Sequence, residues 1–174
     1  MLDVAVAYNR YKFLGYEFLT WLWFMIENEQ GQLKACDPEF RSLSMGNRIV
    51  LENSRHDTRE TLTIKGDEAK LDEGVLALKK GAVVTEMHLI CKAAELVCRF
   101  SIKGESMALS GVKLPETGPV ETGADLEGVL LEKTYLLERF GKMVERLYRQ
   151  FLKQRLSNDW ARKTAPKIKR WIAA

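Results

Sequence analysis

The spacing of apolar residues changes twice along this chain, and that change limits the folds open to it. Over residues 1–31 and again over residues 124–173, apolar side chains recur every three or four positions, as one face of a helix requires. Over residues 47–114 they mainly alternate with polar ones, which is the period of a β-strand. Helices and strands segregated in this way predict an α+β fold. The length of 174 residues predicts a single domain, residues 1–174.

The first block predicts a long helix over residues 4–29 that ends near Gly31. Its second half is apolar on nearly every side, so we expect that half to be buried against a sheet or a partner. The apolar residues that define it are Val6, Phe13, Leu14, Phe18, Trp21, Leu22, Trp23, Phe24, Met25 and Ile26. Stacking of nucleic-acid bases on these aromatics is disfavoured, because the run contains no cations.

The middle block predicts about five antiparallel strands with one apolar and one wet face. A hairpin of residues 48–53 and 58–65 is followed by a short helix over residues 67–80, which stops at Gly81. Short turns then connect a meander of residues 82–92, 95–103 and 106–114, which forces antiparallel pairing. Residues 32–46, with mixed polarity and Pro38, predict a loop.

The last block predicts two helices that follow a linker. A stripe on the first, residues 126–155, is expected to face the core or another helix. Its members are Leu130, Leu137, Phe140, Val144, Leu147 and Phe151. The second helix, residues 158–172, contains Pro166, which must kink or interrupt it. The expected fold is therefore an antiparallel sheet packed with a long amino-terminal helix and carboxy-terminal helices.

Charge is distributed unevenly. Residues 133–174 contain twelve Lys or Arg against three acidic residues, a net charge of +9, whereas the first 132 residues carry −6. On the long helix, cations recur at intervals of three and four and form one stripe, Arg139, Lys142, Arg146, Arg149 and Lys153. The last segment continues the run with Arg155 and Arg162 and with a second predicted patch, Lys163, Lys167, Lys169 and Arg170.

A basic surface of this kind can neutralise several phosphates, which gives salt-sensitive nucleic-acid binding without sequence preference. We therefore predict that the stripe and the second patch contact a DNA backbone. The alternative is an ordinary solvated helix face, since cations near a helix carboxy terminus also favour the macrodipole. Both interpretations are compatible with the spacing.

The residue types that catalysis and metal binding require do not occur together. Cys36, Cys91 and Cys98 form no CxxC pair, and His56 and His88 are the only histidines, so we expect neither a disulfide framework nor a metal site. The glycines of residues 104–111 do not match a phosphate loop. We expect a protein that is not an enzyme and binds no cofactor. The apolar runs are too short to span a membrane and no secretory signal is visible, which predicts a cytoplasmic protein without membrane contact.

Several blocks resemble one protein family. The stretch FLGYEFLTWLWF (residues 13–24) is similar to a block in long bacterial proteins of the recombination-associated RdgC family. Residues 73–84, 109–115, 131–140 and 157–172 resemble the same region in the same order, so the likeness covers almost the whole chain. In those relatives the region follows an amino-terminal portion that is absent from this sequence.

The resemblance implies DNA binding without strong sequence preference and a role in restraining recombinase activity. Compact members of the family assemble as ring-shaped dimers around duplex DNA, but they lack the region matched here. No DNA-contacting residue is therefore carried over to this chain by position.

These observations lead to two hypotheses. The first is a non-catalytic accessory module in recombination or DNA maintenance that contacts the phosphate backbone. The second is an interaction subunit, in which the first helix or the apolar stripe of the long helix docks on a protein partner, on a separately encoded amino-terminal half, or on another copy.

Overall fold

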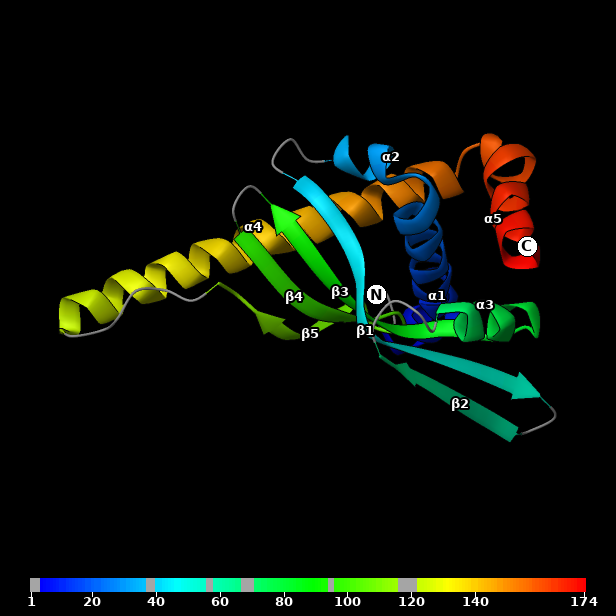
Figure 1. Ribbon diagram of the computed structural model, residues 1–174, viewed down its shortest axis with the longest axis horizontal. Helices are drawn as coiled ribbons and strands as arrows, with labels where there is room; N and C mark the ends of the chain where they lie inside the picture. The colour runs from blue at the N-terminus through cyan, green and yellow to red at the C-terminus, as the bar shows by residue number, and fades with distance from the viewer. Residues whose placement is uncertain (1–3, 37–39, 56–57, 67–70, 94–95, 116–121) are drawn as a thin grey trace.

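The computed structural model describes residues 4–36, 40–55, 58–66, 71–93, 96–115 and 122–174. The fold is α+β, as the sequence predicts, with a five-stranded antiparallel sheet that packs on helices from both ends of the chain (Figure 1). The strands are β1 (Phe40–Arg55), β2 (Thr58–Lys65), β3 (Val83–Ala93), β4 (Leu96–Lys103) and β5 (Ala108–Lys113). Their spatial order is β2-β1-β3-β4-β5.

The β1–β2 hairpin and the β3–β4–β5 meander are confirmed, because each pairs antiparallel with its neighbour in the chain. The crossover between them contains α3 (Leu71–Lys79), which lets β3 pair with the long strand β1. Gly81 has φ +90°, a conformation that suits glycine, and it follows the end of α3 as expected. The first residues of that predicted helix, 67–70, lie outside the described residues.

The prediction of a loop over residues 32–46 is wrong in part. Residues Gln30–Lys34 form a short helix, α2, and β1 begins at Phe40, several residues before the predicted strand. Leu43 and Met45 are buried and lie opposite Cys91 and Leu89 of β3. The alternation of Leu43 and Met45 with serines is therefore a strand pattern, too short to outweigh the surrounding polar residues. Pro38 lies outside the described residues.

Helix α1 (Val4–Asn28) provides much of the core. Every side chain from Phe18 to Ile26, except that of Thr20, is buried, so the expected burial of the apolar half is confirmed. One face of the helix lies on the sheet, and Phe18 and Trp21 also contact Phe151 of α4 (Gly123–Arg155) at ring-centre distances of 5.6 and 5.7 Å. Burial of such aromatic surface is the main favourable contribution to folding.

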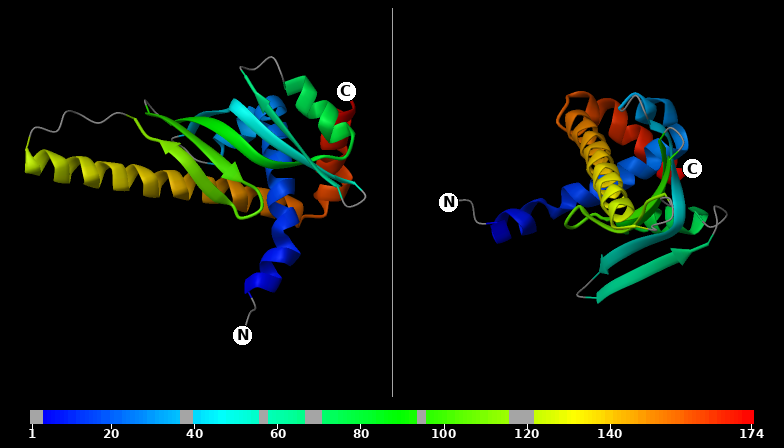
Figure 2. Two further views of the ribbon diagram at one scale, coloured as in Figure 1. Left: turned by 90° about the horizontal axis from the view of Figure 1, so that it is seen from below. Right: turned by 90° about the vertical axis from the view of Figure 1, so that its left-hand side faces the viewer.

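Successive turns of helix α4 lie against successive strands of the sheet. Met143 meets Cys91 of β3, and Phe140 packs edge-on against Phe100 of β4 with 4.3 Å between ring centres. A helical turn of about 5.4 Å nearly matches the strand spacing of about 4.8 Å, and one turn earlier Leu136 is also buried. The helix then continues past the edge of the sheet (Figures 1 and 2).

The expected interruption at Pro166 is also confirmed. After α4 the chain forms a π-helical turn, Trp160–Thr164, and then α5 (Ala165–Ala173), with Pro166 in the first turn of α5. A proline is tolerated there because the first amides of a helix have no partner within the helix. The chain reverses direction earlier, at the non-helical residues 156–158, and this bend returns α5 toward α1 (Figure 1).

Helix α1 crosses the β4–β5 turn at a contact between two glycines. A Cβ atom on Gly15 would lie 1.7 Å from the carbonyl oxygen of Gly104, which is part of the backbone and cannot rotate away. Gly128 of α4 is the matched case, because a Cβ atom there meets nothing within 4 Å.

We predict that Gly15→Ala lowers the free energy of unfolding by at least about 2–3 kcal/mol, because α1 must move off the sheet. The control, Gly128→Ala, should raise it by about 0.5–1 kcal/mol through helix propensity. Urea unfolding followed by circular dichroism measures both values. Equal effects of the two substitutions would contradict the close contact.

Candidate nucleic-acid interface

The predicted stripe lies on the outer face of α4, away from the sheet. Lys142, Arg146, Arg149 and Lys153 are exposed, and Arg139 is partly exposed. Arg149 forms an ion pair with Glu145, one turn before it, at 2.6 Å. The stripe is therefore solvent-facing over four turns, with Arg149 partly neutralised.

Arg155 is partly buried and turns toward α1, so it does not continue the basic stripe. Its guanidinium binds Glu17 of α1 at 2.6 Å and lies 5.2 Å above the ring of Trp160. Trp160 in turn packs on Phe151. These contacts hold the turn after α4 against the protein and direct the next segment back toward α1.

Helix α5 is held to α1 by a shared carboxylate. Glu27 accepts hydrogen bonds from the indole N–H groups of Trp23, at 2.5 Å, and of Trp171, at 2.8 Å. The ring of Trp171 also packs edge-on against the rings of Trp23 and Phe24. Hydrogen bonds to an ionised acceptor are stronger than neutral ones, so this contact fixes the position of α5.

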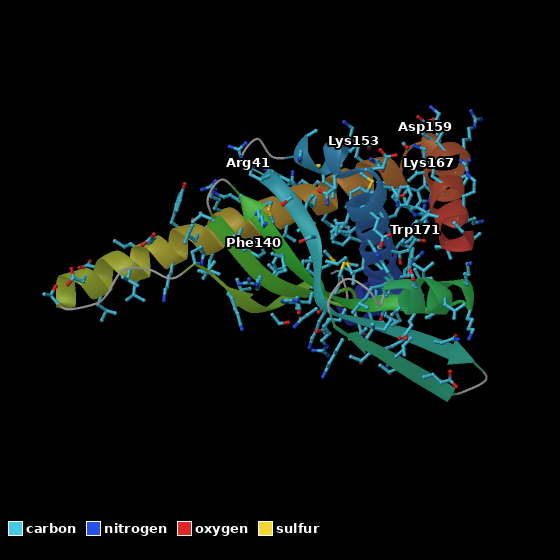
Figure 3. All side chains as sticks on the ribbon, in the orientation of Figure 1. Arg41, Phe140, Lys153, Asp159, Lys167 and Trp171 are labelled. Atoms are coloured by element: carbon cyan, nitrogen blue, oxygen red, sulfur yellow. The ribbon has the colours of Figure 1, made fainter. Side chains whose placement is uncertain are left out.

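Between the ends of α1 and α4, the π-helical turn and α5 lies a groove of about 550 Å³. Phe24 and Met25 line its apolar side, and uncharged polar side chains from α2, α4 and the following residues contribute hydrogen-bonding groups, Gln32, Gln150, Gln154 and Ser157. Gln154 is oriented by the indole N–H of Trp21, which donates to it at 3.0 Å. Figure 3 shows Lys153, Asp159 and Lys167 at this end of the molecule.

Five cations from three elements converge on the groove, namely Lys153, Arg162, Lys163, Lys167 and Arg170. Two acidic residues offset them in part, since Lys163 pairs with Asp159 and Lys167 with Glu29, each at 3.1 Å. The hydrogen bond from Lys167 lowers the pKa of Glu29. Within the described residues, Lys153, Arg162 and Arg170 have no carboxylate partner, which leaves the groove with an excess of three positive charges.

The structure thus brings together part of each predicted set. Lys153 ends the stripe and also lines the groove, where it joins Lys163, Lys167 and Arg170 of the second patch. Arg139, Lys142, Arg146 and Arg149 extend away from it along α4, and Lys169 is exposed on α5 outside the groove.

The sequence pattern did not single out Arg162 or Gln154 as members of a site. Their place depends on the bend after α4, which no local spacing predicts. The gap between the two predicted helices, residues 156–157, was the available signal for that bend.

The cysteines have the surroundings of core residues. Cys91 and Cys98 lie opposite each other on β3 and β4, are buried, and are not bonded to each other. Burial raises the pKa of the Cys98 thiol, so the reactive thiolate is disfavoured. Among the described residues there is no group of three metal-ligating side chains, and no helix there is long and apolar enough to cross a membrane.

Comparison with known protein families, curated proteins and solved structures gave no match to this chain. The likeness to the RdgC family therefore stays a prediction from short sequence blocks. The function proposed for the chain depends on the chemistry of the groove and of α4.

His88 has a structural partner. Its Nδ1 accepts a hydrogen bond from the backbone N–H of Asn47 at 3.2 Å. Partial burial lowers its pKa below the usual 6.5, and the nearby cations Arg99, Lys113 and Arg48 lower it further. The imidazole is therefore neutral at pH 7 and acts as an acceptor on the outer face of the sheet.

Because the unfolded chain binds the proton more readily, we predict that the His88 contribution to stability is present above about pH 6.5 and is lost as the pH falls through its folded pKa. Urea unfolding between pH 7.5 and 5 measures the slope of the unfolding free energy against pH in wild type and in His88→Gln. The substitution should make this slope smaller. The His56→Gln control keeps His88 and should retain the slope. A slope unchanged in His88→Gln would contradict the assignment.

Proposed function

We propose that this chain is a non-catalytic nucleic-acid-binding protein that contacts the phosphate backbone through the groove and the adjoining stripe of α4. The observation that supports this most directly is the convergence of five cations on one groove. A solvated helix face does not need cations from several elements at one place. Binding of successive phosphates of one strand does need them.

The composition of the groove suits phosphates better than a single small anion. Lysines and arginines from α4, the π-helical turn and α5 surround an open groove, and the stripe continues the positive charge along α4. An extended polyanion can follow both surfaces, starting at Lys153, which they share. Contacts of this kind use the backbone and give no base specificity.

The resemblance to RdgC-like proteins favours DNA over RNA and favours an accessory role in recombination or DNA maintenance. A second candidate function is assembly with another polypeptide. The observation that favours it is the exposed apolar half of α4, where Leu126, Leu130 and Leu137 are each about half exposed. The two functions use different faces of the helix and are compatible.

We predict salt-sensitive binding to short labelled duplex and single-stranded DNA, measured by fluorescence anisotropy across a salt series. The variant Lys153→Glu/Arg162→Glu/Arg170→Glu should lose at least about tenfold in affinity. The slope of log affinity against log salt concentration should become shallower by about 2–3. All three side chains are exposed in the described structure, so the fold should be retained.

The matched control reverses three cations on the outer face of the sheet, Lys92→Glu/Arg99→Glu/Lys113→Glu. It changes the net charge by the same amount at a different place and should bind nearly as wild type does. Equal losses in the two variants would show that net charge and not the groove causes binding. Absence of binding at low salt would exclude the proposed function.

A further inference from the structure

The amino-terminal half of α4 lies apart from the rest of the fold. Figure 1 and the left-hand view of Figure 2 show this half, drawn in yellow, beyond the edge of the sheet. A capping box defines its start, because the amide of Thr122 donates to Asp125 at 2.8 Å and the amide of Asp125 donates to the Thr122 hydroxyl. Several helical turns are thus specified where the sheet does not cover them.

These turns continue the seam that α4 uses inside the protein. The seam has a seven-residue repeat with positions labelled a to g, of which a and d face a partner. Within the fold, Phe140 (d), Val144 (a), Leu147 (d) and Phe151 (a) are buried. Beyond the sheet the same positions hold Leu126 (d), Leu130 (a), Lys133 (d) and Leu137 (a), and the three leucines are 49%, 57% and 47% exposed.

Position g widens this face with Val129, whereas Leu136, the next g position, is already buried within the fold. An apolar stripe of this width is typical of a helix that packs on another element. An isolated helix of a few turns is marginal in water, so a covering partner would stabilise it.

The charges on this face indicate which partner fits. Between residues 126 and 137, positions a, d, e and g carry only two charged side chains, Lys133 at d and Glu127 at e. Asp125, Glu132 and Glu138 occupy the outer positions b and c and point away from a partner. The seam is therefore self-complementary, with one cation and one anion on each copy.

We propose that the exposed half of α4 pairs antiparallel with the same half of a second copy of this chain. In this register Leu126 packs on Leu137 of the other copy, Leu130 lies beside Lys133, and Lys133 reaches Glu127 one turn away. Each contact occurs twice, as a two-fold interface requires. A parallel pair would instead place the two Lys133 side chains against each other in the seam.

The pairing leaves the basic stripe open. Arg139, Arg146 and Lys153 occupy position c and Lys142 and Arg149 position f, which lie farthest from the seam. The contact covers only about three turns of each helix. It therefore buries less surface than the roughly 1,200 Å² that stable complexes bury. We therefore expect a reversible dimer with a dissociation constant in the micromolar range.

Sedimentation equilibrium of the full chain, from low micromolar concentrations to about 0.5 mM, tests the proposal. Wild type should shift from monomer to dimer. Leu130→Glu and Leu137→Glu should raise the dissociation constant at least about tenfold, because each places charge in the seam. The control Leu131→Glu changes a more exposed leucine, 66% exposed at position b, and should leave the dimer intact.

Charge exchange tests the antiparallel register itself. Lys133→Glu and Glu127→Lys should each weaken the dimer, and the double variant should restore it, because the pair re-forms in reverse between copies. The two residues are six positions apart on one helix and do not face each other within it, so rescue must occur between chains. A wild type that stays monomeric at 0.5 mM, loss of the dimer in Leu131→Glu, or failure of the double variant to recover would each overturn the proposal.

Discussion

The burial of the aromatic half of α1 is the interaction on which the other packing depends. Phe18 and Trp21 contact Phe151, while Trp23 and Phe24 contact Trp171, so one helix supplies the surface for both α4 and α5. The sheet covers the opposite side of α1. Because this apolar surface is shared by three elements, each of them is placed by its contact with α1.

The groove is a consequence of this packing. Its cations come from segments that approach one another only because α5 is returned to α1 by Trp171 and Glu27, which are 144 residues apart in the sequence. The charged side chains repel one another, and the aromatic contacts beneath them offset that cost. A positive surface of this kind is stable because the apolar contacts that support it are separate from the charges it presents.

The fold class could be predicted from the sequence because the periods of the two structural types are distinct. The alternation at Leu43 and Met45 was too short to be recognised beside a polar segment, so the start of β1 was missed. The outer position of Arg146 follows from helical spacing, whereas the inward turn of Arg155 depends on Glu17 and Trp160, which come from other segments. Local spacing cannot contain that information.

The same distinction applies to the apolar stripe of α4. Leu130 and Val144 occupy the same seam position, and only the width of the sheet determines that one is exposed and the other buried. The sequence alone predicted a stripe that faces either the core or another helix. In the structure the stripe is divided between the two environments at the edge of β5.

Helix α4 runs unbroken for 33 residues, so distances along it follow from a rise of about 1.5 Å per residue. In an antiparallel pair centred between residues 131 and 132, the two Lys153 side chains would lie about 65 Å apart along the axis. Two turns of duplex DNA, at about 34 Å each, have nearly the same length. Under the proposed pairing and DNA binding, the length of α4 would set the distance between the two positions on one duplex that both copies reach together.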